Sequence, residues 1–116
     1  MSEPIRVAVV MVTHQGRYLV GQRAPGTRFA GMSEFPGGKC EPGESFEDCA
    51  RRECLEETGL ELDSITPFSQ MQAATPESAD WQLKFFLSEL AAERVVPDNC
   101  GSFVWLTYLE DRKSVV

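Results

Sequence analysis

The sequence predicts a mixed α/β (α+β) domain, in which several strands form one sheet and a single helix packs against it. Short runs rich in β-branched residues, or alternating between apolar and polar side chains, occur on both sides of the middle of the chain and predict strands. Between them, one stretch has helical spacing with helix signals at both of its ends. At 116 residues the chain has room for one hydrophobic core, so we expect a single domain over residues 1–116.

The first two strands are expected to form a hairpin. Residues 5–12 are a continuous β-branched run, which is typical of a buried central strand. Residues 14–16 have the composition of a turn, and residues 18–20 resume the extended pattern, so the two runs are expected to pair. His14 is accordingly interpreted as a polar turn residue.

The next segment combines an exposed loop and a short strand. Arg23 lies at the exit of the second strand, and residues 24–32, which contain proline and glycine, are expected to form a loop. Phe35 is expected in a short strand that breaks into a turn at residues 36–38, because Pro-Gly-Gly favours turn conformations. Loops of this kind often carry binding groups.

One helix is predicted with both of its ends defined. Ser45 can accept a hydrogen bond from a first-turn amide, and the acidic residues that follow suit the positive end of the helix dipole. Gly59 fits the left-handed conformation that closes many helices, and Leu60 is expected to pack back onto the last turn.

Further strands complete the predicted sheet. A strand is expected from Ile65, and residues 73–79, which are small and include a proline, are interpreted as a loop. Residues 82–90 alternate apolar and polar side chains and predict a strand. A turn at residues 97–99 then leads into a last strand over residues 103–108.

Net charge and the lack of long apolar runs limit which molecules the protein is expected to bind. A formal net charge of -7 opposes binding to long nucleic acids, but a divalent cation can reverse the local charge for a small phosphorylated ligand. The sequence has neither a bilayer-spanning apolar run nor a secretion signal, so we expect no membrane contact and a cytoplasmic location. The four cysteines are expected to remain reduced and to serve as small core residues.

Three glutamates gather on one side of the predicted helix. At about 100° per residue, Glu53, Glu56 and Glu57 fall within roughly one third of the helix circumference. Their arc overlaps that of the residues expected to face the core, which are Phe46, Ala50 and Cys54. Carboxylates at a core boundary repel each other and lose hydration, which indicates a bound cation such as magnesium or manganese. The alternative is a solvated acidic face with ion pairs such as that of Arg52 with Glu56, one turn apart.

Residues 38–60 contain a dense pattern of fixed residues. The positions are Gly38, Glu44, Arg52, Glu53, Glu56, Glu57 and Gly59, with Cys54 and Leu60 at apolar positions. This pattern resembles the signature of the Nudix hydrolase family at every fixed position. The resemblance implies an α/β/α sandwich with a mixed β-sheet that carries the signature loop and helix. Such domains usually continue into a second helix, of which only residues 110–116 remain here, and an uncovered sheet face would favour a homodimer.

The resemblance also implies a role for each matching residue. Mg²⁺ is the expected ion and Mn²⁺ the alternative, with ligands from the Gly38 backbone carbonyl and the carboxylates of Glu53, Glu56 and Glu57. Glu44 and Arg52 would join the loop to the helix and orient Glu53 through an ion pair. The residues implied in catalysis are therefore Glu53, Glu56, Glu44 and Arg52.

A carboxylate has to accept the proton of the attacking water, and family members differ in which one does so. Some use a signature glutamate, and others use a glutamate on a later loop. At that loop this chain offers Asp98 or Asn99 instead. The departure favours Glu53 or Glu56 as the base.

Residues 33–39 resemble the segment before the signature in MutT-like nucleoside triphosphate pyrophosphohydrolases. The implied reaction converts a small nucleotide, a (deoxy)nucleoside triphosphate, into the monophosphate and pyrophosphate. Arg23 and Lys39 would contact phosphates, with Asp98 as a further substrate contact, although these side chains are equally ordinary on a surface. Base recognition would come from Phe35, Phe85 or residues 73–80, where the alternative for the aromatics is a core role.

Two other functions stay open at this stage. One keeps the chemistry and changes the substrate to ADP-ribose, a nucleotide sugar or a dinucleoside polyphosphate. The other is a non-catalytic module that senses a nucleotide, although such a module has no need of the whole set of metal-binding glutamates.

Overall fold

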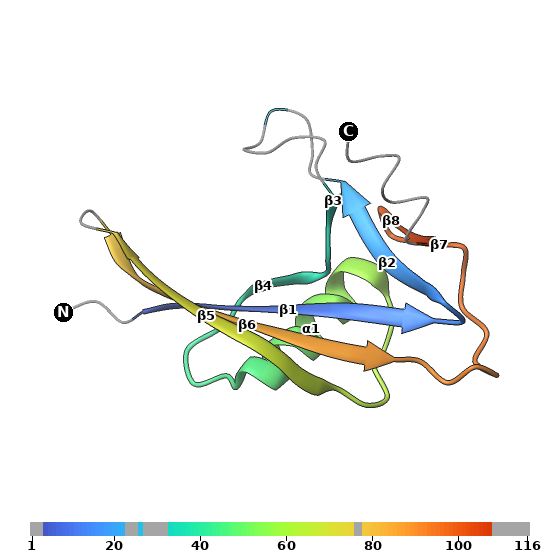
Figure 1. Ribbon diagram of the computed structural model, residues 1–116, viewed down its shortest axis with the longest axis horizontal. Helices are drawn as coiled ribbons and strands as arrows, with labels where there is room; N and C mark the ends of the chain where they lie inside the picture. Colours follow the sequence, from blue (N-terminus) through green and yellow to red (C-terminus); the bar gives the residue numbers. More distant parts are fainter. Residues whose placement is uncertain (1–3, 23–25, 27–32, 76–77, 108–116) are drawn as a thin grey trace.

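The computed structural model describes residues 4–22, 26, 33–75 and 78–107. These residues form one mixed β-sheet with a helix, α1, against one of its faces (Figure 1). The helix is Phe46–Thr58, and the strands are β1 (Ile5–His14), β2 (Arg17–Gln22), β3 (Ser33–Glu34), β4 (Gly37–Lys39), β5 (Thr66–Thr75), β6 (Ser78–Glu89), β7 (Asn99–Cys100) and β8 (Phe103–Leu106). The strand order is β5-β6-β1-β2-β8-β7, with β3 paired to β2 and β4 paired to β1. The predicted α+β class with a mixed sheet is confirmed.

Strand β1 is the centre of the sheet because it pairs along both of its edges. One edge runs parallel to β6, in a register that places Val9 opposite Phe85. The other edge runs antiparallel to β4, with Ala8 opposite Gly38, and then to β2. The predicted central strand and its hairpin with β2 are therefore confirmed.

The hairpin turn between β1 and β2 is made by Gln15 and Gly16. Both have positive φ, at 50° and 80°, as in the two-residue turns whose twist matches that of paired strands. His14 is instead the last residue of β1 and is only 8% exposed, with its ring 5.8 Å from that of Trp105. The interpretation of His14 as a turn residue is therefore wrong, because it continues the buried side of the strand.

The hydrophobic core lies between β1 and α1. Alternate side chains of β1 point toward the helix and are fully buried, while the helix contributes small residues from the facing side. The fully buried members from these two elements are Ala8, Val10, Val12, Cys49, Ala50 and Cys54. Cys100 is also buried and Cys40 is half-buried, and all four cysteines are free. The prediction that the cysteines serve as small core residues is confirmed for the three buried ones.

Both predicted ends of α1 are confirmed. The Ser45 hydroxyl accepts a hydrogen bond from the backbone N–H of Asp48 at 3.0 Å. At the other end Gly59 has a left-handed φ of 78° and its N–H donates to the carbonyl of Leu55. Leu60 is 5% exposed and belongs to the core, as expected for a residue that packs back onto the last turn.

The predicted turn at residues 36–38 is wrong, because Gly37 and Gly38 lie in strand β4. A Cβ added at Gly37 would come within 2.4 Å of the backbone oxygen of Ala8, so β4 approaches β1 this closely only with glycine there. Phe35 lies between β3 and β4 and not in the strand that the sequence predicted. The glycine pair serves close strand approach and not chain reversal.

The loop predicted over residues 73–79 is wrong for residues 73–75 and 78–79, and residues 76–77 lie outside the described residues. Strand β5 continues to Thr75 and β6 begins at Ser78, and these two residues pair across the hairpin. The long ladder between β5 and β6 supports extended backbone where the residue types alone suggested a loop. The strands predicted from Ile65 and over residues 82–90 are confirmed.

The turn predicted at residues 97–99 lies further along the chain. A short strand, β7, begins at Asn99 and pairs with β8 across a turn at Gly101. The last predicted strand is confirmed as far as Leu106. The loop predicted over residues 24–32 lies outside the described residues, apart from Gly26.

The face of the sheet opposite α1 carries apolar side chains. On β6, Leu83, Phe85 and Leu87 are half-buried and Trp81 is 36% exposed, whereas the intervening Phe86 points toward the core. Among the described residues no helix covers this face, and the predicted remnant of a second helix lies outside them. A search of the same residues finds no helix with the length and apolarity needed to cross a membrane.

Candidate active site

The signature residues meet where β4 packs against α1. The Glu53 side chain is 17% exposed and lies against Gly38. A Cβ at Gly38 would lie 2.4 Å from the carboxyl carbon of Glu53, so glycine is what leaves room for this carboxylate. Gly38 also pairs with Ala8 of the central strand. The sheet and the helix therefore position Glu53 together.

Arg52 joins the acidic residues of the loop and the helix. Its Nε and Nη2 donate to the two carboxylate oxygens of Glu44 at 2.8 and 3.0 Å, a two-pronged pair. Its Nη1 lies 3.0 Å from Oε1 of Glu53 and 3.3 Å from Oε2 of Glu56. Nη2 also donates to the carbonyl of Lys39 at 3.2 Å. The structure thus contains the expected link from loop to helix, together with the Arg52–Glu56 ion pair that belonged to the alternative of a solvated acidic face.

Glu44 is held as a carboxylate by these contacts. The hydrogen bond from Arg52, followed by one from the backbone N–H of Glu41 at 3.0 Å, lowers the pKa of Glu44 to about 2. The same pairing raises the pKa of Arg52 above its ordinary value. The side chain of Arg6 in β1 donates to the backbone carbonyl of Glu44. The loop is therefore fixed both to the helix and to the central strand.

Glu57 has a different environment at the last turn of the helix. Its Oε1 accepts a hydrogen bond from the backbone N–H of Gly37 at 2.9 Å. Although part of the residue reaches solvent, loss of hydration raises the pKa of Glu57, and repulsion from Glu53, Glu34 and Glu56 acts in the same direction. Glu57 therefore lies close enough to the other acids to be destabilised by them.

This repulsion bears on whether the residues fit a divalent cation. Three carboxylates around one helical turn supply hard oxygen donors, and a cation among them would remove the repulsion felt by Glu57. In the structure Arg52 holds Glu53 and Glu56, whereas the Gly37 amide holds Glu57. The donor chemistry fits magnesium, and the ligand roles remain a prediction.

A second group of possible ligands lies beside this cluster. The ligand atoms of Cys40, Glu44 and Cys49 all lie within 4.8 Å of one another. Among the described residues, the predicted glutamates Glu53, Glu56 and Glu57 do not form such a group. The Cys49 thiol donates to the carbonyl of Gly38 at 3.4 Å, and burial raises the pKa of Cys49 to about 12. No local pattern in the sequence pairs Cys40 with Cys49, since nine positions separate them.

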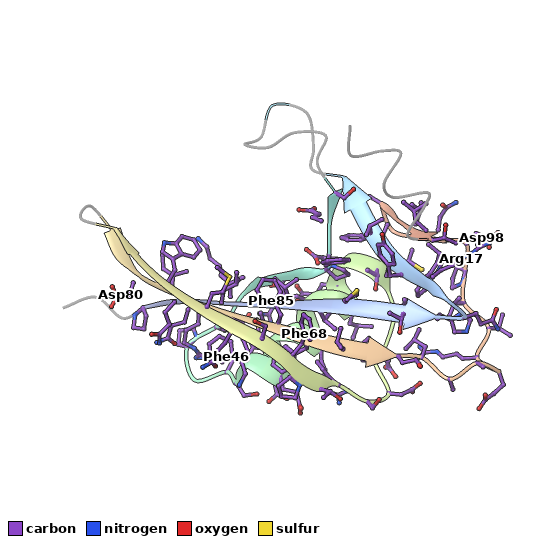
Figure 2. The ribbon with its side chains drawn as sticks, in the orientation of Figure 1. Arg17, Phe46, Phe68, Asp80, Phe85 and Asp98 are labelled. Carbon is purple, nitrogen blue, oxygen red and sulfur yellow. The ribbon has the colours of Figure 1, made fainter. Side chains whose placement is uncertain are left out.

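The residues predicted to contact substrate are more scattered. Lys39 is exposed, with Nζ 6.0 Å from the ring of Trp81, and Phe35 packs edge-on against Tyr18. Asp98 lies beside Arg17 at the end of the sheet where β1 turns into β2 (Figure 2). Arg23 lies outside the described residues.

Asp98 and Arg17 line a cavity of about 520 Å³, which His14, Arg94 and Trp105 also line. Lys39 lies on β4, and Phe35 lies between β3 and β4. Phe85 lies on β6, on the face of the sheet away from the core.

Two backbone positions support the site without having been predicted. The Gly37 amide binds Glu57, and the pair Gly37-Gly38 was the available signal for it. Gly101 has a φ of 65°, and a Cβ there would lie 2.3 Å from the backbone oxygen of Glu57. The turn between β7 and β8 therefore packs directly on the end of α1, a contact for which the sequence carries no local signal.

The profile of the NUDIX domain family matches residues 3–110, which is nearly the whole chain. The chain belongs to the NUDIX family. Its fold agrees with this, since the NUDIX chain is similar to the solution structure of the E. coli ORF135 protein, with a TM-score of 0.71 and 25% identity over 96% of this chain and 79% of that one.

Curated relatives of this NUDIX chain include nucleotide hydrolases. The oxidized purine nucleoside triphosphate hydrolase of Danio rerio is 41% identical over 59 residues, which cover 51% of this chain and 37% of that protein. The CTP pyrophosphohydrolase of Escherichia coli is 40% identical over 57 residues, which cover 49% of this chain and 42% of that protein. The matched part therefore spans about two fifths of these relatives.

Proposed function

We propose that this NUDIX chain is a divalent-metal-dependent pyrophosphohydrolase that converts a (deoxy)nucleoside triphosphate into the monophosphate and pyrophosphate. The observation that carries the proposal is the joined set of Glu44, Arg52 and Glu53 against Gly38. An acidic surface stripe would not need a glycine to admit one carboxylate or an arginine to hold another in a two-pronged pair. The set instead resembles a support for oriented carboxylates.

The chain's residues have three tasks in this reaction. Glu53, Glu56 and Glu57 would hold Mg²⁺, with Mn²⁺ as the alternative. The ion supplies charge neutralisation of the diphosphate and lowers the pKa of a bound water. Glu44 and Arg52 keep Glu53 oriented, because Arg52 contacts both glutamates at once.

We assign the proton-accepting role to Glu56. Its side chain is 58% exposed and has a single ion pair to Arg52 at 3.3 Å, so it can reach a water and take its proton. Glu53 is less free, since it lies between Arg52 and Gly38. Asp98 lines a cavity together with Arg17 and His14, so we prefer Glu56 for the role.

The substrate class is supported by the relatives named above, which act on oxidized purine nucleoside triphosphates and on CTP. Lys39 stays a predicted phosphate contact; it is exposed, but it alternates with Gly38 along β4 and its ammonium lies 6.0 Å from the centroid of the Trp81 ring. ADP-ribose, nucleotide sugars and dinucleoside polyphosphates remain the competing substrates. A nucleotide-sensing module without turnover remains the competing function.

The deciding experiment measures monophosphate and pyrophosphate release from a panel of these nucleotides, with and without Mg²⁺. Glu56→Gln is the test variant, and Glu47→Gln, an exposed acid in the first turn of the same helix, is the matched control. We expect turnover that requires metal, collapses in Glu56→Gln and persists in Glu47→Gln. Nucleotide binding without turnover anywhere in the panel would replace the hydrolase by the sensing module.

The setting of the protein is also part of the proposal. All four cysteines are free, which fits a reducing compartment such as the cytoplasm. We propose that residues 1–116 act as one domain, because one core joins the helix to the sheet. A homodimer through the apolar sheet face stays a prediction, to be checked by the mass of the protein in solution.

A further inference from the structure

Two cysteines and a glutamate form a cluster at the base of the signature loop. Cys40 follows β4, Glu44 lies in the loop, and Cys49 is in the first turns of α1. Their ligand atoms, two sulfurs and a carboxylate oxygen, all lie within 4.8 Å of one another. Neither cysteine occupies a fixed position of the signature, so the proposed hydrolase function does not account for the pair.

The spacing of these atoms suits a tetrahedral ion. Zinc binds thiolate sulfur at about 2.3 Å, which places two ligands of a tetrahedral site about 3.8 Å apart. Ligand atoms already within 4.8 Å therefore need only small side-chain movements to reach that geometry. Two of the three donors are soft thiolate sulfurs, which distinguishes the set from the oxygen ligands of Glu53, Glu56 and Glu57.

Burial and charge are consistent with an ion at this position. Cys49 is fully buried and the Glu44 side chain is 15% exposed, while the half-buried Cys40 leaves a route from solvent. Two thiolates and one carboxylate would be balanced in formal charge by a divalent cation together with Arg52, whose Nη2 lies 4.0 Å from the Cys49 sulfur. Such balance matters where charges are partly removed from water.

We propose that Cys40, Glu44 and Cys49 form a second metal site, selective for a thiophilic divalent cation of the zinc class. On binding, each thiol releases its proton to solvent and each sulfur forms a bond to the ion. Glu44 contributes one oxygen, and a water entering on the Cys40 side fills the fourth position. No oxidation or reduction is involved.

Occupation of this site would tie the signature loop to the helix. The Cys49 thiol would no longer donate to the Gly38 carbonyl, because its proton is lost. Oε1 of Glu44 accepts from Arg52 and from the Glu41 amide, whereas Oε2 accepts from Nε of Arg52 and has a second lone pair, so Oε2 can bind the ion while both bonds from Arg52 persist. The ion would therefore crosslink the loop to α1 and stabilise the loop, whether or not a nucleotide is bound.

The test is a Co²⁺ titration of the whole chain under a phosphine reductant, with excess Mg²⁺ present to occupy oxygen sites. Thiolate coordination gives an intense charge-transfer band, which carboxylate coordination lacks. The expected result is a band that saturates at one ion per chain and disappears when Zn²⁺ is added. In Cys40→Ala and Cys49→Ala we expect the affinity to fall at least about 10- to 100-fold.

Cys54→Ala is the matched control, since Cys54 is fully buried in the same helix and lies outside the cluster. It should keep the band, as should Glu56→Gln, whose altered residue belongs to the hydrolase proposal and not to this one. Zn²⁺ should also raise the melting temperature of the wild type more than that of Cys40→Ala. Equal Co²⁺ spectra for the wild type and a folded Cys40→Ala, or no thiolate band at all, would overturn the site.

Discussion

Two groups of carboxylates at α1, named here the Arg52 half and the Glu57 half, have opposite environments. In the Arg52 half, Glu44 of the loop and Glu53 of the helix share Arg52 at distances of 2.8 to 3.0 Å, and the pKa of Glu44 falls to about 2. In the Glu57 half, Glu57 in the last turn accepts a hydrogen bond from the backbone amide of Gly37, and lost hydration raises its pKa. The protein itself therefore supplies a cationic partner for Glu44 and Glu53, whereas Glu57 has a neutral amide as its partner and is repelled by Glu53, Glu34 and Glu56.

This difference indicates a division of labour along one helix. A satisfied pair needs no reorganisation when substrate arrives, so the Arg52 half is suited to holding geometry. A repelled carboxylate gains most from a cation, so the Glu57 half is suited to binding one. Stability and metal affinity should therefore respond in opposite directions to substitutions in the two halves.

The largest expected effect follows from removing Arg52. In Arg52→Ala, Glu44 and Glu53 lose their shared partner, and Glu53 is no longer oriented. We expect kcat to fall about 100-fold, the scale of a loss of alignment, with Arg52→Lys recovering part of it. The measurement is steady-state nucleotide hydrolysis.

The control for this change is Arg51→Ala. Arg51 neighbours Arg52 on the helix but donates to the backbone carbonyl of Leu62 at 2.8 Å. Its kcat should stay within a few-fold of the wild type. Equal losses for the two arginines would mean that helix stability, and not the orientation of Glu53, explains the effect.

A smaller effect is expected from a methyl group at Gly38. In Gly38→Ala the added carbon meets the flexible Glu53 carboxylate, so the fold should survive while kcat falls about 10- to 100-fold. Gly37→Ala meets the backbone of Ala8 instead, and should cost about 1–3 kcal/mol of unfolding free energy. Urea unfolding and activity measured on both variants separate the two outcomes, and an unfolded Gly38→Ala would contradict the assignment.

Glu57→Gln sharpens the contrast between the halves. Removing a repelled, partly desolvated charge should raise the melting temperature of the metal-free protein by about 2–4 °C. The same variant should lose most of the stabilisation that Mg²⁺ gives the wild type. Glu47→Gln, away from the cluster, should show neither change in thermal unfolding, and a lower melting temperature for Glu57→Gln would mean that its bond to Gly37 outweighs the repulsion.

The smallest effect appears only in acid. The pKa of Glu44 is lowered in the folded state, so its contribution to stability is complete above its ordinary value near 4.5 and is lost as the pH falls toward about 2. The stability gap between the wild type and Glu44→Gln should therefore be constant near neutrality and close between about pH 4.5 and 2. Urea unfolding across this range measures the gap, and a gap that persists at pH 2 would have to come from packing.

The parts of the structure that the sequence predicted are those encoded locally. Ser45 and Gly59 satisfy groups within one turn of themselves, so residue type alone identifies both helix ends. The acidic arc of α1 follows from helical geometry in the same way. The signature spacing then links Glu44 to Arg52 across eight positions, a pairing that the structure contains.

The errors arose where distant segments decide the conformation. The pair Gly37-Gly38 has the composition of a turn, but β1 on one side and Glu53 on the other make it a strand without side chains. His14 looked like part of the turn because its neighbours are turn residues. The alternation of buried residues along β1 was the missed signal. Gly101 offers no such signal, since its contact with α1 depends on the tertiary fold.

The parallel pairing of β1 with β6 has a consequence for how the protein is made. Ile5 lies opposite Trp81, so β1 cannot pair with β6 until most of the chain has been synthesised. On the ribosome, β1 and its hairpin would emerge long before β6, with an apolar edge open to other chains. During synthesis β1 would need protection from pairing with other chains. We therefore expect a higher yield of folded protein when dilute full-length chains refold than when the chain folds during translation.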